Sequence, residues 1–195
     1  MPLTVASDPQ PPLCRPAHEL PPLTVQPVST PAVARLWNEY VDTPLSGSQM
    51  RYEIFSGDLR VALISFGASA WKLVRASSSS AGAQRRRNLQ LVINSARLLV
   101  LPWIQSMGLA SKILSLIARQ FPYDWQQRYG YRPVSLETFV ETSRHRGTCY
   151  KAANWTLVGQ TTGRGKLEVT HQRAVPVKDI LLYPLSRHFR AVLCK

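Results

Sequence analysis

The sequence predicts a single mixed α/β domain behind a proline-rich lead. Nine of the 15 prolines lie between Pro2 and Pro31, and proline interrupts both helix and sheet hydrogen bonding. Beyond them, segments with strand and helix patterns follow one another. The 195 residues are enough to bury one sizeable core. We therefore expect a flexible lead over residues 1–31 and a globular domain over residues 32–195.

The first half of the domain is expected to contain a hairpin. Residues 33–40 predict a short helix. Residues 50–74 alternate as two strands, and Ser56–Leu59 (SGDL) supplies the turn between them. A small-residue loop over 75–84, a short basic helix over 83–96 and a buried strand over 97–102 should follow.

The second half begins with the clearest periodicity in the chain. Apolar residues recur every three or four positions, which predicts an amphipathic helix that Pro122 should end: Leu109, Ile113, Leu116, Ile117 and Phe121. A short turn or helix closed by Gly130 follows. We then expect a strand over 133–140, a short helix over 147–154, and strands over 155–160 and 177–185. The sheet should be mixed and flanked by helices.

The net charge of +13 makes nucleic acid the default macromolecular partner, because such a field attracts phosphates. A solvated charged surface or an acidic protein partner would also account for it. Tyr150 and Trp155 lie among the basic residues and could stack on bases or belong to the core. The candidate nucleic-acid contacts are Arg85, Arg86, Arg87, Arg144, Arg146, Lys151, Arg164 and Lys166.

Several classes of protein find no support in the sequence. The longest apolar run, Leu98–Ile104, is too short to span a bilayer. The three cysteines stand far apart, which argues against a disulfide framework or zinc site and for a reducing cytoplasm. Neither a G-x-S-x-G motif nor a paired acidic cluster for Mg²⁺ is present. We therefore expect no metal and no membrane association.

The element order and the motif QSMGLA resemble the GNAT acyltransferase fold. That resemblance implies a GNAT-like, mostly antiparallel sheet with a cradle for the pyrophosphate of acetyl-CoA or another acyl-CoA. The cradle would consist of Gln105, Gly108, Leu109, Ala110 and Ser111.

The stretch RGTCYKAANWTLVGQ carries the second GNAT feature. Tyr150 precedes Asn154-Trp155 where the family often has Gly-Phe, and the resemblance implies that it is the general acid; a tyrosine that packs the helix on the sheet is the alternative. Glu137, on a strand, is the best-placed carboxylate for a general base, with Glu141 next. A structural partner for a nearby arginine is the alternative for Glu137.

A longer resemblance extends from Met50 to Cys194. The segments FGASAWKL, AQRRRNLQLVINSARLLVLPW, DWQQRYGYRPVSLETFVE and VKDILLYPL resemble the DruA-like domain family, which is named for the Druantia anti-phage defence system. Relatives also occur beside transposase genes. Relatives usually have a further N-terminal region and a Trp-rich loop where this chain has SSSSAG, so the resemblance implies a shortened relative.

Three functions follow as expectations. The first is a defence or mobile-element protein that binds nucleic acid through a basic face, with an acyl-CoA crevice that is reused or vestigial. The second is an active acyltransferase acting on nucleic acid or a protein amine. The third is a scaffold subunit that docks partner proteins of a defence system through the proline-rich lead.

Overall fold

A computed structural model describes residues 13–28, 47–69, 88–163 and 176–193. Its centre is a seven-stranded sheet in the order β2-β3-β4-β5-β7-β9-β8, in which β5 and β7 are parallel and all other neighbours antiparallel. The strands are β2 Leu23–Pro27, β3 Gln49–Ser56, β4 Leu59–Ala68, β5 Val92–Val100, β7 Ser135–Glu141, β8 Thr156–Gln160 and β9 Lys178–Pro184. The prediction of a mixed, mostly antiparallel sheet flanked by helices is confirmed.

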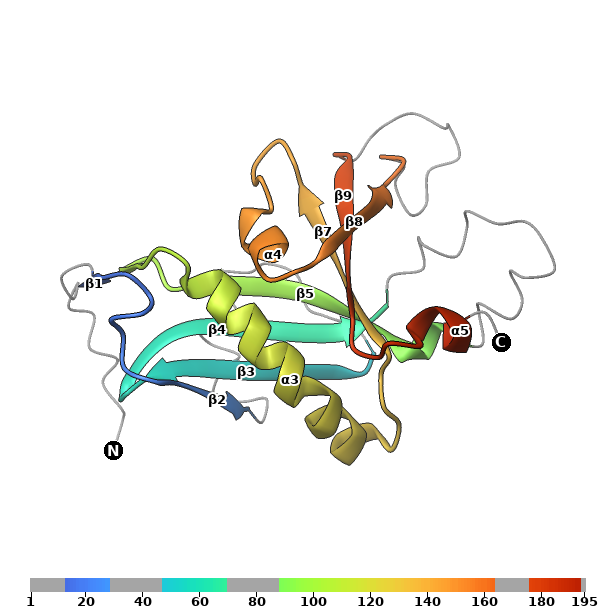
Figure 1. The fold of residues 1–195 in the computed structure, drawn as a ribbon, viewed down its shortest axis with the longest axis horizontal. Helices are drawn as coiled ribbons and strands as arrows, with labels where there is room; N and C mark the ends of the chain where they lie inside the picture. The colour runs from blue at the N-terminus through green and yellow to red at the C-terminus, as the bar shows by residue number, and fades with distance from the viewer. Residues whose placement is uncertain (1–12, 29–46, 70–87, 164–175, 194–195) are drawn as a thin grey trace.

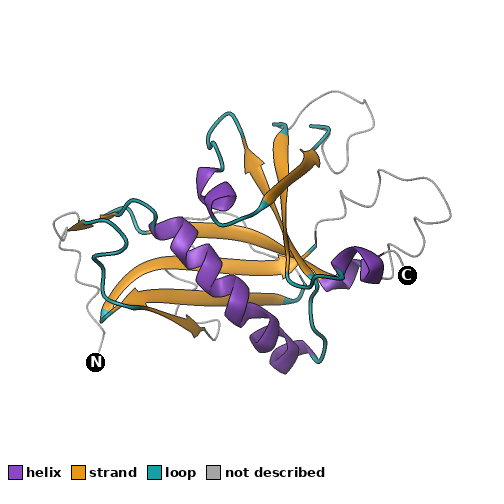
Figure 2. Ribbon diagram, in the orientation of Figure 1, coloured by secondary structure: helices purple, strands orange, loops and turns teal. Residues whose placement is uncertain are grey.

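Helices and two short strands complete the described fold. They are β1 Leu13–Cys14, β6 Ile104–Gln105, the 3₁₀ turn η2 Leu89–Leu91, and the helices α3 Leu109–Tyr129, α4 Thr148–Ala152 and α5 Phe189–Leu193. In Figure 1, β2 to β5 run side by side, α3 crosses them, and β7, β9 and β8 rise away from them. Figure 2 shows the same two sets of strands in orange, with the short α4 beside β7.

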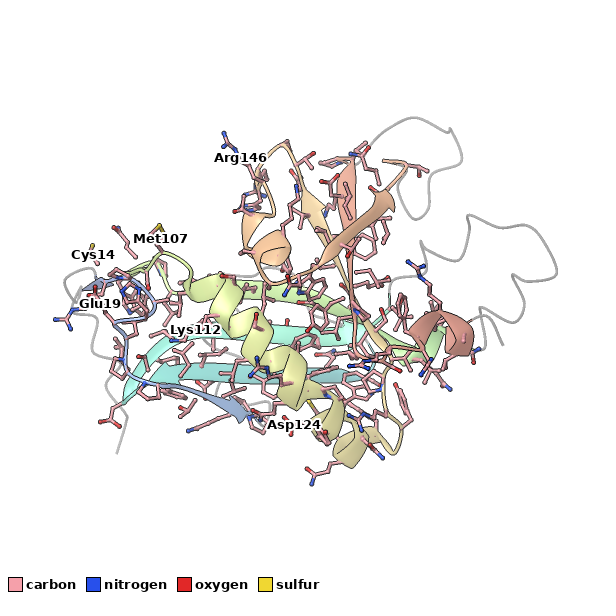
Figure 3. The ribbon with its side chains drawn as sticks, viewed as in Figure 1. Cys14, Glu19, Met107, Lys112, Asp124 and Arg146 are labelled. Carbon is pink, nitrogen blue, oxygen red and sulfur yellow. The ribbon has the colours of Figure 1, made fainter. Side chains whose placement is uncertain are left out.

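The core lies between α3 and the hairpin of β3 and β4. Phe121 of α3 stacks on Phe66 of β4 with ring centroids 4.3 Å apart, and Trp125 lies 5.2 Å from Phe121. The Tyr52 hydroxyl donates a hydrogen bond of 3.0 Å to Asp124 Oδ2 of α3. Asp124 is labelled in Figure 3. Burial of large aromatic rings of this kind contributes most of the free energy that holds a helix on a sheet.

Residues 13–28 belong to the fold, which corrects the predicted boundary between residues 31 and 32. β2 pairs with β3 over five register positions, from Leu23 opposite Ser56 to Pro27 opposite Tyr52. Ala17 and Leu20 are each 7% exposed and join the core. Prolines are tolerated here because β2 is an edge strand, whose outer side needs no hydrogen-bond partner within the sheet.

Two further expectations are wrong. Pro122 does not end α3, which continues to Tyr129 and closes at Gly130 with φ +78°. Proline removes one backbone donor, but the buried contacts of Trp125 offset that loss. The basic helix expected over 83–96 does not extend to its end either, because η2 is followed by β5 from Val92; the β-branched Val92 and Ile93 favour a strand.

The remaining predicted elements divide into two groups. The hairpin turn at Gly57, the strands β7, β8 and β9 and the short helix α4 are confirmed. The helix over 33–40, the loop over 75–84 and Arg85, Arg86 and Arg87 lie outside the described residues. Within the described ranges, no helix is both long and apolar enough to cross a membrane.

Candidate functional site

The main cleft lies where β5 and β7 separate. These two strands pair over three positions, ending at Asn94 opposite Glu137, and then diverge. The space between them has a volume of about 810 Å³. Ala96–Leu99 of β5 form one wall and Thr138–Glu141 of β7 the other, and the loop from Arg144 to Tyr150 covers the space together with Lys178. In Figure 1, β7 can be seen rising away from β5.

Tyr150 lines the cleft from α4. Its helix α4 starts at Gly147, whose φ of +64° is left-handed and whose Cα faces Val140 so closely that a Cβ would lie 3.5 Å from Val140 Cγ1. This tight turn returns α4 onto β7. The Tyr150 ring packs edge-on against the buried Trp155, with centroids 5.1 Å apart.

Hydroxyl groups surround the phenol of Tyr150. Thr138 Oγ1 donates a 3.0 Å hydrogen bond to the carbonyl oxygen of Ser95, and both residues are almost fully buried. Burial raises the pKa of Tyr150, and the neighbouring Thr138 and Ser95 side chains lower it in part. The phenol therefore keeps its proton at neutral pH and can act as a hydrogen-bond or proton donor.

The mouth of the cleft is positively charged. Its lining contains the cationic side chains of Arg97, Arg144, Arg146 and Lys178, and one carboxylate, Glu141. Arg144 and Arg146 are exposed, and no ion pair involves either of them in the part of the chain that the structure describes. Figure 3 shows Arg146 at the outer tip of the loop between β7 and α4, pointing away from the body of the protein. This arrangement favours an anionic ligand.

The two candidate carboxylates differ in position. Glu137 is fully buried, its Oε1 accepts a 2.7 Å hydrogen bond from Ser69 Oγ, and it does not line the cleft. Glu141 does line the cleft, and its Oε1 accepts a hydrogen bond of 3.0 Å from Ser143 Oγ. Glu137 thus occupies a buried, hydrogen-bonded position outside the lining of the cleft, and Glu141 is the candidate carboxylate that lines it.

The predicted cofactor cradle is at the start of α3. Gly108 precedes the helix with φ +82° and no side chain caps its first turn, as expected of a loop that presents free amides to an anion. Leu109 is fully buried, and Ser111 Oγ donates to the Gly108 carbonyl at 2.9 Å. None of the five cradle residues lines the cleft.

A segment before β2 lies against this helix start. We call residues 13–20 the strap. β1 of the strap pairs in parallel with β6, the Ala17 amide donates to the Met107 carbonyl at 3.2 Å, and Lys112 Nζ donates to the Ala17 carbonyl at 3.0 Å. Cys14, Met107 and Lys112 mark this region in Figure 3. The residues predicted to hold acyl-CoA lie outside the lining of the cleft, and the strap contacts the cradle directly.

The structure brings together some of the predicted nucleic-acid contacts. Arg144 and Arg146 line the cleft, while Lys151 is exposed on α4 outside the lining. The others lie outside the described residues: Arg85, Arg86, Arg87, Arg164 and Lys166.

Sequence reasoning missed Arg97, Lys178 and Ser95. Burial lowers the pKa of Arg97, and the charge of Arg51 lowers it further. The sequence signal available for Arg97 was its placement beside the apolar run of β5, where a charged side chain usually has a specific environment; Lys178, at the start of β9 next to Asp179, gave no such signal.

The fold is similar to that of solved acetyltransferases. Solved N-acetyltransferases resemble the chain closely in length but not in sequence. A mutant form of spermidine N-acetyltransferase SpeG from Vibrio cholerae aligns with a TM-score of 0.54 at 10% identity, covering 87% of this chain and 98% of that one. The putative acetyltransferase yncA from Salmonella typhimurium, solved with its cofactor acetyl-CoA, aligns with a TM-score of 0.50 at 14% identity, covering 85% and 95%. The predicted GNAT-like topology is confirmed, and at these identities the likeness shows the fold alone.

The family is more specific. The family described as Druantia protein DruA matches residues 16–173, so the chain belongs to that family, and membership implies a role in anti-phage defence. The match begins inside the strap, in agreement with its place in the fold. No curated protein matches the sequence.

Proposed function

We propose that this DruA-family protein acts in anti-phage defence by binding nucleic acid at the cleft between β5 and β7. The observation that carries the proposal is the charge of the cleft lining, with four cationic side chains against one carboxylate. The net charge of +13 extends the same field over the whole chain. Phosphate neutralisation supplies most of the sequence-independent affinity for nucleic acids, so this charge distribution suits that ligand.

The test is the salt dependence of oligonucleotide binding. We expect the double variant Arg144→Ala/Arg146→Ala to lose two phosphate contacts, which lowers the slope of log K against log salt by about 1.4 for a single strand. At 0.1 M salt that corresponds to a loss of about 25-fold in affinity. Arg119→Ala/Arg187→Ala removes the same charge from exposed positions outside the cleft. Equal losses in the two double variants would contradict the assignment to the cleft.

Acyl transfer is the second candidate function. Tyr150 favours it, because the residue lines the cleft on α4 and retains its proton, as a general acid for a leaving thiolate must. Bound acyl-CoA would supply an activated thioester. The separation of the cradle from the cleft and the burial of Glu137 away from it place this candidate second.

Acetyl-CoA provides the test of the second candidate. A site that binds it should raise the melting temperature as the ligand concentration rises, and Tyr150→Phe should retain that shift while losing any transfer. If acetyl-CoA causes no shift and nucleic-acid binding shows no salt dependence, the scaffold function remains, in which partner proteins of the defence system dock on this chain. Location in the cytoplasm is part of this proposal.

A further inference from the structure

We infer that the cleft receives one unpaired nucleotide of a single strand, with its base inside and its phosphates at the mouth. The inference rests on the proposed function and adds the substrate class. It starts from three properties of the cleft: its volume, the hydroxyl and aromatic groups in its lining, and the cations at its mouth.

The volume suits one nucleotide. Sites for small organic ligands measure about 300–1,000 Å³, and the cleft measures about 810 Å³. Bases within a duplex are stacked and paired, so a cleft of this volume can receive a base only from a single strand or from a nucleotide that has left the helix. An unpaired base is therefore the part of a nucleic acid that this cleft can enclose.

The lining around Tyr150 offers both hydrogen bonding and stacking. Ser95 is 1% exposed and is not itself part of the lining. It lies beside the phenol of Tyr150, which lines the cleft, and next to Thr138, whose hydroxyl proton is committed to the Ser95 carbonyl. The Tyr150 hydroxyl belongs to a residue that lines the cleft, so it is the polar group that the edge of a base could meet there.

Two aromatic residues belong to the lining of the cleft. Phe139 and Tyr150 both line the cleft, and the Tyr150 ring is held edge-on by Trp155. Stacking of a base on an aromatic side chain contributes about 1–3 kcal/mol and tolerates any base. The aromatic rings and hydroxyls of the cleft lining match the base of a nucleotide, and the arginines at the mouth match its phosphate.

The mouth positions the backbone of the strand. Arg144 and Arg146 follow β7 in the loop that covers the cleft, and Arg146 extends from the tip of that loop (Figure 3). The guanidinium group binds phosphate through two parallel hydrogen bonds. These two arginines can therefore hold the phosphates on either side of an inserted nucleotide.

The experiment compares three oligonucleotides that carry 2-aminopurine at one position: a single strand, a perfect duplex, and a duplex in which that nucleotide is a one-base bulge. We expect the single strand and the bulge to bind at least about tenfold more tightly than the perfect duplex, which must first unstack and unpair the base. The 2-aminopurine fluorescence should change on binding, because the base leaves its neighbours and meets the rings of the cleft.

Variants separate the base contacts from the phosphate contacts. Ser95→Ala and Thr138→Val remove hydroxyls with little change of volume, and Phe139→Leu removes a ring. We expect each to weaken single-strand binding and reduce the fluorescence change without altering the salt slope, whereas Arg144→Ala/Arg146→Ala lowers the slope. Melting curves confirm that each variant is folded, and an unfolded one is replaced by Tyr150→Phe.

The outcomes distinguish the two proposals. The inference is overturned if salt-dependent binding is equal for the single strand and the perfect duplex, or if none of the hydroxyl and ring variants affects it. The proposed function remains intact in either case. Absence of binding to every oligonucleotide overturns both. A cleft that instead responds to acetyl-CoA also overturns the inference and supports the acyltransferase.

Discussion

Leu20→Ala tests whether the strap is part of the folded core. The side chain is 7% exposed and packs in the main hydrophobic cluster. The substitution removes about three carbon groups, each contributing about 0.8 kcal/mol. Some relaxation around the vacated space is expected near the edge of the core, so the free energy of unfolding should fall by about 2–3 kcal/mol.

Urea and thermal unfolding measure this loss. For a chain of this length, about 1 kcal/mol corresponds to about 2–4 °C in melting temperature, so Leu20→Ala should lower it by about 5–10 °C. His18→Ala is the matched control in the same strap, because its side chain is 81% exposed and its removal should change stability by less than about 0.5 kcal/mol. An unchanged melting temperature in Leu20→Ala would refute the packing of the strap and restore a domain boundary near residue 32.

Three other substitutions or treatments have defined outcomes. Burial and the nearby Asp124 raise the pKa of Tyr52 above its usual value of 10.0. Because Tyr52 ionises first in the unfolded chain, the folded state loses stability as pH rises above about 10. In unfolding titrations, Tyr52→Phe should lose less stability than the unsubstituted protein over that range. A parallel decline in both proteins would be inconsistent with this account. Gly108→Ala places a side chain at φ +82° and should lower the stability measured in thermal melts by about 1 kcal/mol. Gly159→Ala, at an ordinary φ with open space around it, should lower it less. The reverse order would contradict the left-handed conformation of Gly108. Burial raises the pKa of Cys149, so iodoacetamide should modify this thiol in the native protein more slowly than it modifies an exposed thiol. A bound oligonucleotide should slow the modification further. Mass spectrometry that finds no protection by the oligonucleotide would place the ligand elsewhere.

Local patterns predicted the parts of the fold that local forces determine. The hairpin of β3 and β4 follows from alternating residues and a glycine turn, and α3 begins where its periodicity begins. The end of α3 was predicted wrongly because Pro122 acts on the local backbone, whereas Phe121 and Trp125 hold the helix through contacts with the sheet. Proline density likewise hid β2, since an edge strand needs hydrogen bonds on one side only.

The candidate site was predictable in part. Family resemblance identified Tyr150, and charge identified Arg144 and Arg146, which the structure brings to one cleft. Arg97 and Lys178 come from strands whose patterns give no sign that β5 and β7 diverge. That divergence depends on the packing of the whole sheet, so it has no local signal in the sequence.

The strap has a consequence for the order in which the chain folds. Its hydrogen bond from Lys112 to Ala17 joins residues 95 positions apart, so on the ribosome the strap emerges long before its partner exists. Closing so long a loop carries an entropic cost that local turns do not. The strap should therefore dock after α3 has packed, and native-state hydrogen exchange should find its amides among the first to open. The start of α3 would then be exposed briefly during synthesis and again whenever the strap opens.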